Sequence, residues 1–252
     1  MQAFNSKLLQ DFISQKVIAP FYNIRLKKLE SLQLNDILKR KNPYLFKAKN
    51  IQTAEELVRY ILDAFLPSQE ETIFGNLMED LAIYVCSIVY KGYKAEQGKY
   101  KSVDLIFEKN DILYIVGIKS GPFWGNKDQI DKMKGNFNKA KKELSKTYNS
   151  RIVAVNGCIY GKDNKHLKGA SGSTYYKYCG QEFWNFITGD SDFYKKIIIP
   201  IDKEAKERDI KFREIYSSKI NELTKDFSNN FLSKEGHISW EKIIDFVSKK
   251  NN

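Results

Sequence analysis

The sequence is poor in cysteine, histidine and proline, and each shortage excludes a class of protein. Its 252 residues include three cysteines, two histidines and five prolines. The cysteines show no close pairing and no CxxC spacing, so they indicate neither a disulfide framework nor a zinc site, and a reducing cytoplasm is expected. The two histidines are too isolated for a metal or triad argument. No apolar run reaches the roughly 18 residues of a membrane span, and the first residues lack a secretory pattern.

Positive charge is what the sequence has in excess. Lysine and arginine number 42 against 31 aspartate and glutamate, which gives a formal net charge of +11 and a pI near 9.3. A polyanion is the natural partner of such a chain. The plainer alternative is a soluble protein that is simply rich in lysine.

The order of apolar segments predicts an α/β core between two helical segments. One helix is expected to begin at a capping box of Thr53 and Glu56 and to stop at Pro67, and a second helix spans about 69–90. The expected division of the chain, packed as one unit, is an N-terminal helical segment at 1–67, the core at 68–201 and a C-terminal helical segment at 202–252.

Strands and helices alternate within the predicted core. Strands are expected at 103–107, 112–119 and 151–155, with a polar turn at 108–111 and a lysine-rich helix at 127–148 that Asn126 caps. Later segments are a surface loop at 161–172, a packed segment at 183–187 and a short buried strand at 196–201.

Two charged residues stand where buried strands normally have none. Asp104 lies in the first apolar strand and Lys119 ends the second. An Asp and a Lys side by side at the edge of a sheet suggest a metal-dependent site that cuts phosphodiesters, because Mg²⁺ takes carboxylates plus waters and leaves room for the phosphate. Asp104 is the first candidate ligand, Lys119 would stabilise developing charge or lower the pKa of the attacking water, and the Ile118 carbonyl and Glu79 are further ligand candidates.

Each of these residues also has a purely structural interpretation. Asp104 could pair with a lysine at a strand end, Lys119 could extend its ammonium group to solvent, and Glu79 could hydrogen-bond to backbone or to a lysine.

The sequence resembles a known nuclease superfamily at these positions. Asp104 followed by Ile115-Val116-Gly117-Ile118-Lys119 resembles the motif of PD-(D/E)XK nucleases. Two longer runs resemble one group of Type II restriction endonucleases. The first is Ile118–Pro122 together with Trp124, Gly125, Asn126 and Gln129. The second is Tyr175–Trp184 together with Ile187–Asp190.

The resemblance covers about residues 70–200. It implies a mixed β-sheet flanked by helices, with added N- and C-terminal helices. It also implies a Mg²⁺-dependent homodimer that cuts a short palindromic site in double-stranded DNA. Such an enzyme would work in the bacterial cytoplasm, with a cognate DNA methyltransferase in the same host.

Gly117 departs from the family pattern, which has Glu or Asp two residues before the lysine. Glycine is also a poor choice for a buried strand. Three accounts remain open. The glycine could replace an original carboxylate and inactivate the enzyme, the missing carboxylate could come from the following helix through Asp131 or less well Asp128, or the motif could be a coincidence.

Residues expected to contact DNA lie in two places. Around the turn and helix after Lys119 the candidates are Ser120, Trp124, Asn126, Lys127, Lys132 and Lys134. In the loop that would read base edges they are Lys162, Asn164, Lys165, His166 and Lys168. Most lysines of a helix face solvent, so only some would touch DNA.

The sequence supports three classes of function. The main interpretation is a Type II restriction endonuclease or an inactive form of one. The alternatives are a sequence-specific DNA-binding protein without catalysis and a repair or junction nuclease on the same fold.

Overall fold

The chain divides into two compact units. The computed structural model describes residues 5–96, 98–165 and 175–250. The sheet unit comprises Met1–Ala19 and Phe74–Glu204, and the helical unit comprises Pro20–Ile73 and Ala205–Asn252. The expected boundaries after residues 67 and 201 lie near two of these changes, but the first nineteen residues group with the sheet.

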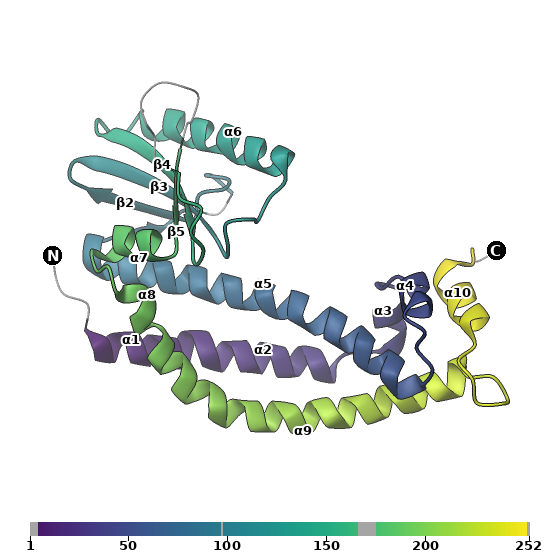
Figure 1. Ribbon diagram of the computed structural model, residues 1–252. Helices are drawn as coiled ribbons and strands as arrows, with labels where there is room; N and C mark the ends of the chain where they lie inside the picture. The colour runs from purple at the N-terminus through teal and green to yellow at the C-terminus, as the bar shows by residue number, and fades with distance from the viewer. Residues whose placement is uncertain (1–4, 97, 166–174, 251–252) are drawn as a thin grey trace. The chain divides into compact units, whose positions relative to one another are not determined.

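A five-stranded mixed sheet forms the centre of the sheet unit (Figure 1). The strands lie in sequence order, antiparallel from β1 to β3 and parallel from β3 to β5. Their bounds are β1 (Tyr93–Lys94), β2 (Leu105–Lys109), β3 (Ile112–Lys119), β4 (Arg151–Cys158) and β5 (Tyr176–Cys179).

Short helices complete this unit, and two long helices contribute to both units. The helices of the sheet unit are α1 (Ser6–Phe12), the π-helix η1 (Ile13–Ile18), α6 (Lys127–Leu144), α7 (Gln181–Thr188) and α8 (Phe193–Lys196). The long helices are α5 (Ala54–Tyr90) and α9 (Ile198–Phe231).

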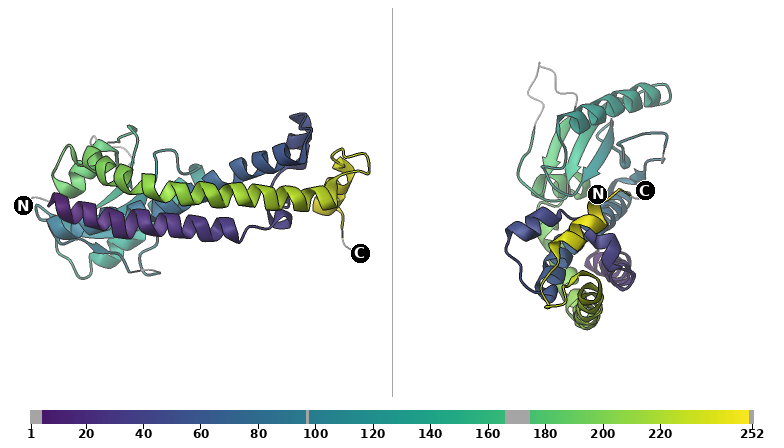
Figure 2. Two further views of the ribbon diagram at one scale, coloured as in Figure 1. Left: turned by 90° about the horizontal axis from the view of Figure 1, so that it is seen from below. Right: turned by 90° about the vertical axis from the view of Figure 1, so that its right-hand side faces the viewer.

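Helices cover both faces of the sheet, as Figures 1 and 2 show. The side that α6 covers holds a buried apolar cluster, which includes Ile106, Leu113, Ile115, Met133, Phe137, Ala140, Leu144 and Ala154. On the other side, the ring of Tyr114 lies 4.9 Å from that of Phe186 in α7. Since side chains alternate along a strand, Gly117 and Lys119 belong to the side of β3 that faces α6.

Local signals in the sequence account for the turns of this core. Asn110 and Asp111 join β2 to β3 with φ of 52° and 56°, the backbone that a two-residue hairpin requires and that Asn and Asp tolerate. Asn126 accepts a hydrogen bond from the Gln129 backbone N–H, and the Gln129 side chain accepts one from the Asn126 N–H. The predicted cap of α6 is therefore confirmed, whereas the predicted turn at 108–111 is shortened to residues 110 and 111, because β2 extends through Lys109.

The helical unit packs α2 against parts of α5 and α9 (Figure 2). Arg25 of α2 lies 2.5 Å from Glu70 and 3.6 Å from Asp209, and its guanidinium group lies 3.3 Å from the ring centre of Phe212. The shorter helices of the unit are α2 (Ala19–Glu30), α3 (Leu34–Leu38), α4 (Pro43–Ala48) and α10 (Trp240–Ser248).

The expected break at Pro67 is wrong, because α5 runs through it. Proline cannot donate to the carbonyl four residues earlier, here that of Asp63, but only this one hydrogen bond is lost. The adjacent carbonyl of Ala64 accepts a hydrogen bond from Lys41 Nζ at 2.5 Å. Apolar residues on both sides of the proline are buried and favour a continuous helix, namely Leu62, Phe65, Leu66 and Ile73.

The expected strand at 196–201 is also wrong. The segment holds the end of α8 and the start of α9, and Ile198 and Ile199 are 62 % and 76 % exposed. Pro200 fits the first helical turn, where its missing N–H costs nothing. In contrast, β5 was not expected as a strand, because Lys177 interrupts its short apolar pattern.

Only α5, among the described residues, is long and apolar enough to cross a membrane by length and composition. The core helix of a soluble protein passes the same test, and Leu81, Ala82, Val85 and Cys86 of α5 are buried. The helix is thus a weak indication of a membrane span.

Replacement of Pro67 by alanine is expected to stabilise the chain by about 1–3 kcal/mol, because alanine restores the helical hydrogen bond without a steric cost. Chemical denaturation of the two proteins measures the difference in the free energy of unfolding. Ser68→Ala, next to it on the exposed side, should change stability by less than about 0.5 kcal/mol. A lower stability of Pro67→Ala would show that the packing of α5 requires the proline.

Candidate functional site

The β2–β3 hairpin brings Asp104 beside the end of β3. Leu105 pairs with Val116 in the antiparallel register, so the residue before β2 lies next to the last residues of β3. The backbone N–H of Asp104 donates to the Val116 carbonyl at 2.8 Å, and Asp104 Oδ2 accepts from the Ile118 N–H at 2.6 Å. The carboxylate is therefore held one residue from Lys119.

Helix α5 adds Glu79 to this pair, and β1 adds Lys94. Burial and the negative charge of Asp104 raise the pKa of Glu79, while the charges of Lys94 and Lys119 lower it. Lys94 Nζ lies 2.9 Å from Asp80 Oδ1 and 3.7 Å from Glu79 Oε1. Three carboxylates and two ammonium groups thus interact at one edge of the sheet.

Lys119 is oriented by a short chain of polar contacts. Its Nζ donates to the Ile118 carbonyl at 2.9 Å and lies 5.5 Å from the centre of the Trp124 ring. The Trp124 indole N–H donates to Asn156 Oδ1 at 3.0 Å, and Asn156 Nδ2 donates to the Gly117 carbonyl at 3.3 Å. Asn156 is only 1 % exposed, so this support of β3 is well shielded from water.

Gly117 lies where the chain leaves little space for a side chain. A Cβ atom there would lie 2.5 Å from the Ser102 carbonyl oxygen and 3.1 Å from Cζ of Phe137. Ser102 is itself held by a hydrogen bond from Asn136 Nδ2 to its hydroxyl at 2.8 Å. A larger residue at position 117 would therefore require movement of the Ser102 backbone.

Two carboxylates offer the oxygen donors that a hard divalent cation prefers. Among the residues that the structure describes, no group of three or more His, Cys, Asp or Glu side chains could hold a metal ion. Mg²⁺ is usually bound through one or two carboxylates with several waters, so the donors of Asp104 and Glu79 fit it. The Ile118 carbonyl already accepts from Lys119.

Asp131, the alternative ligand, is engaged elsewhere. It lies 2.9 Å from Lys134 on the same helix, and this lysine lowers the pKa of the carboxyl group. Asp128 lies exposed in the first turn of α6.

The residues expected to contact DNA fall into two groups. Several are exposed, namely Ser120, Asn126, Lys127, Lys132, Lys162 and Lys165. Others already have partners inside the protein, since Trp124 binds Asn156, Lys134 pairs with Asp131, and Asn164 Oδ1 accepts from the Cys179 N–H at 2.6 Å. His166 and Lys168 lie outside the described residues. Their roles all stay predictions.

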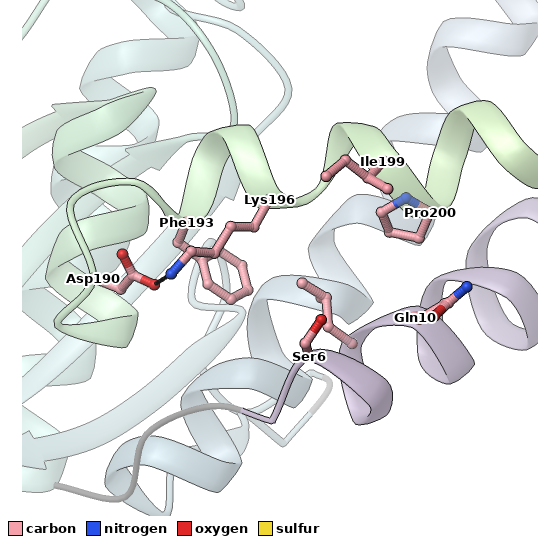
Figure 3. Close-up of a pocket in the computed structure, with 8 residues that line it drawn as sticks. Ser6, Gln10, Asp190, Phe193, Lys196, Ile199 and Pro200 are labelled. Carbon is pink, nitrogen blue, oxygen red and sulfur yellow. Dashed lines mark hydrogen bonds and ion pairs between the residues drawn. The ribbon is translucent and has the colours of Figure 1, made fainter.

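A separate cavity in the sheet unit lacks the same chemistry. It measures about 270 Å³ and is lined by apolar side chains together with Ser6, Gln10, Asp190 and Lys196 (Figure 3). Its one carboxylate, Asp190, is hydrogen-bonded to Lys196. This cavity therefore lacks the pair of acids found beside Lys119.

Sequence reasoning missed three residues of this region. Asn156 interrupts the apolar pattern of β4, which was a signal that could have been used. Lys177 is 6 % exposed and interrupts β5 in the same way. Lys94 gave no signal, because it precedes a polar segment and comes to Glu79 only through the pairing of β1 with β2.

Glu79→Gln is expected to raise the melting temperature at neutral pH in the presence of EDTA. Because the pKa of Glu79 is raised in the folded chain, its ionisation destabilises the fold, and this cost is present above the raised pKa and absent below the ordinary value of about 4.3. The gain should thus vanish near pH 4. Glu143→Gln is the control, because Lys146 lowers the pKa of Glu143, so this change should bring no gain.

Comparison with known proteins identifies the family of the chain. No curated protein matches the chain. A family model described as Type II restriction endonuclease EcoO109I matches residues 7–209, which is most of the chain and includes Glu79, Asp104 and Lys119. Because the match covers most of its residues, the chain belongs to the Type II restriction endonuclease EcoO109I family.

Proposed function

We propose that this chain cleaves double-stranded DNA by Mg²⁺-dependent hydrolysis, at the site formed by Asp104, Glu79 and Lys119. The observation that carries the proposal is the hydrogen bond of 2.6 Å between Asp104 and the Ile118 N–H, which holds a carboxylate next to a lysine at a sheet edge. The fold would then be that of the PD-(D/E)XK nucleases, with helices added at both ends.

The acidic pair would hold the metal. Asp104 and Glu79 supply carboxylate oxygens, and the Ile118 carbonyl is a third candidate donor once Lys119 turns away from it. A bound Mg²⁺ would neutralise phosphate charge and favour ionisation of a water molecule. Burial and the charge of Asp104 raise the pKa of Glu79, and a bound cation would offset both effects, which supports this assignment.

Lys119 would act on the phosphate itself. An ammonium group beside the scissile phosphate stabilises the charge that develops on its oxygens. The Trp124 ring below Lys119 Nζ and the Asn156 bond behind that ring limit where the ammonium can move. Lys94 is the cation that balances Glu79 and Asp80 before metal binding.

Because position 117 carries glycine instead of a carboxylate, the proposal has two versions. In the first version Glu79 supplies the second carboxylate and the chain is active. The close approach of Ser102 to Gly117 supports it, since a side chain at 117 does not fit the present backbone. In the second version the chain has lost a carboxylate at 117 and is a DNA-binding protein without catalysis.

Homodimerisation and a palindromic site belong to the proposal as well. A two-fold symmetric protein presents the same contacts to both halves of a palindrome. Residues 1–66 and 202–250 are the proposed interface, because the core of the nuclease does not require them. The steep salt dependence of binding that several phosphate-contacting lysines would cause is a further expectation.

Incubation of plasmid DNA with the chain and Mg²⁺ tests the main proposal. Discrete fragments are expected, and Asp104→Asn, Glu79→Gln and Lys119→Met should each reduce the cleavage rate by about 100-fold or more. Each variant should keep its DNA affinity in Ca²⁺ within about 10-fold, as fluorescence anisotropy reports. Asp131→Asn is the matched control for a carboxylate outside the acidic pair. Loss of cutting in this variant, with Glu79→Gln active, would move the second carboxylate to α6.

Gly117→Glu separates the two versions. If Glu79 completes the site, this variant should cut no faster than the unmodified chain, because it displaces the Ser102 backbone. If instead the unmodified chain binds DNA without cutting and Gly117→Glu gives discrete fragments, the chain is an inactive relative. Cleavage that follows junctions or flaps rather than a sequence would indicate a repair nuclease.

A further inference from the structure

The turn between β3 and α6 presents one aromatic ring almost wholly to solvent. Phe123 is 91 % exposed, more than any other large hydrophobic residue in the part of the chain that the structure describes. Single exposed hydrophobic residues are common on protein surfaces, so exposure alone assigns no role. The anchoring of the turn distinguishes Phe123 from the others.

The residue before Phe123 is held by a buried charge. Lys177 Nζ donates to the Pro122 carbonyl at 2.8 Å and to Asp163 Oδ2 at 2.6 Å. The side chain of Lys177 is 8 % exposed, so this ammonium group is withdrawn from water and fixed by its two acceptors. The backbone at position 122 is therefore anchored to β5 and to the loop after β4.

The residue after Phe123 is held by a buried amide. The Trp124 indole N–H donates to Asn156, which is 1 % exposed in β4. Two residues further on, Asn126 begins α6 with its capping box. The turn is thus fixed on both sides, so the backbone at Phe123 has little conformational freedom to lose when the ring binds a partner.

Lysines lie in the segments on either side of this turn and in the loop that contacts it. Lys119 lies over the Trp124 ring, adjacent in sequence to Phe123, and Lys127 and Lys162 are exposed at the start of α6 and in the loop after β4. The Tyr160 ring, 62 % exposed, lies against Gly121 in the same turn. An exposed aromatic ring among lysines fits an anion that also has flat apolar surfaces, and a nucleic acid is such a partner.

We propose that Phe123 inserts between bases of the DNA duplex next to the phosphate that Lys119 contacts. The inference rests on the proposed function, because it places the ring beside the site of cutting. Apolar wedges of this kind unstack one base step and bend the duplex. Phe123 would thus fix the position of the strand relative to Lys119 and favour sequences that unstack easily.

The test uses a short duplex selected from a random pool by binding to the chain in Ca²⁺, with fluorescein at one end. Phe123→Ala is expected to bind about 10-fold more weakly, and Phe123→Trp within about 3-fold of the unmodified chain, since base–aromatic stacking tolerates either ring. In a second measurement, 2-aminopurine replaces one base at a time along the duplex. Its fluorescence should rise at one base step when residue 123 is Phe or Trp, and should stay quenched when residue 123 is Ala.

Ile198→Ala is the matched control, because Ile198 is a large hydrophobic residue that is 62 % exposed and lies outside the proposed interface. It should change neither affinity nor fluorescence, and Phe123→Ala should melt within about 2 °C of the unmodified chain. Unchanged affinity and brightening in Phe123→Ala would overturn the inference alone. The inference would also be overturned if Phe123→Ala formed fewer dimers, as measured by sedimentation, while the brightening of 2-aminopurine stayed unchanged. Absence of any DNA binding by the unmodified chain would overturn the proposed function and the inference together.

Discussion

The hydrogen bond from the Ile118 N–H to the Asp104 carboxylate is the interaction on which the candidate site depends. It fixes the first residue before β2 against the last residues of β3, so two opposite charges from one hairpin meet at a sheet edge. The rest of the sheet unit supports this arrangement. Helix α6 covers the side of β3 that carries Gly117, β4 places Asn156 behind Trp124, and α5 brings Glu79. Electrostatic repulsion between the two carboxylates remains in the folded chain, which is typical of a site kept for function rather than for stability.

The core of the fold was predictable from the sequence because its signals are local. The apolar run at 112–119, the polar turn at Asn110 and Asp111, and the cap at Asn126 each depend on neighbouring residues, and the structure contains the corresponding strand, turn and cap. The segments that failed depend on distant contacts. Helix α5 continues through Pro67 because buried residues on both sides outweigh one lost hydrogen bond, and β5 tolerates Lys177 because Asp163 neutralises it. Neither compensation can be read from a window of sequence.

The same distinction applies to the site. The hairpin argument was enough to bring Asp104 near Lys119, since Asp104 directly precedes β2 and Lys119 ends the adjacent strand β3. Glu79 could be named as a candidate because a lone acid stood in an apolar helix, but its interaction with Asp104 required the packing of α5. Lys94 and Asn156 could not be placed without the sheet register. The space around Gly117 was equally hidden, because it is set by the Ser102 carbonyl and the Phe137 ring, fifteen and twenty positions away in the sequence.

The charged residues of the candidate site come from different elements of the fold, and this affects when the site can form as the chain folds. A hairpin such as β2–β3 closes within microseconds and unites Asp104 with Lys119 by local contacts alone. Glu79 precedes both in the sequence, and it comes near them only through the packing of α5 against the sheet. On the proposed assignment, a half-made chain carries an incomplete set of ligands.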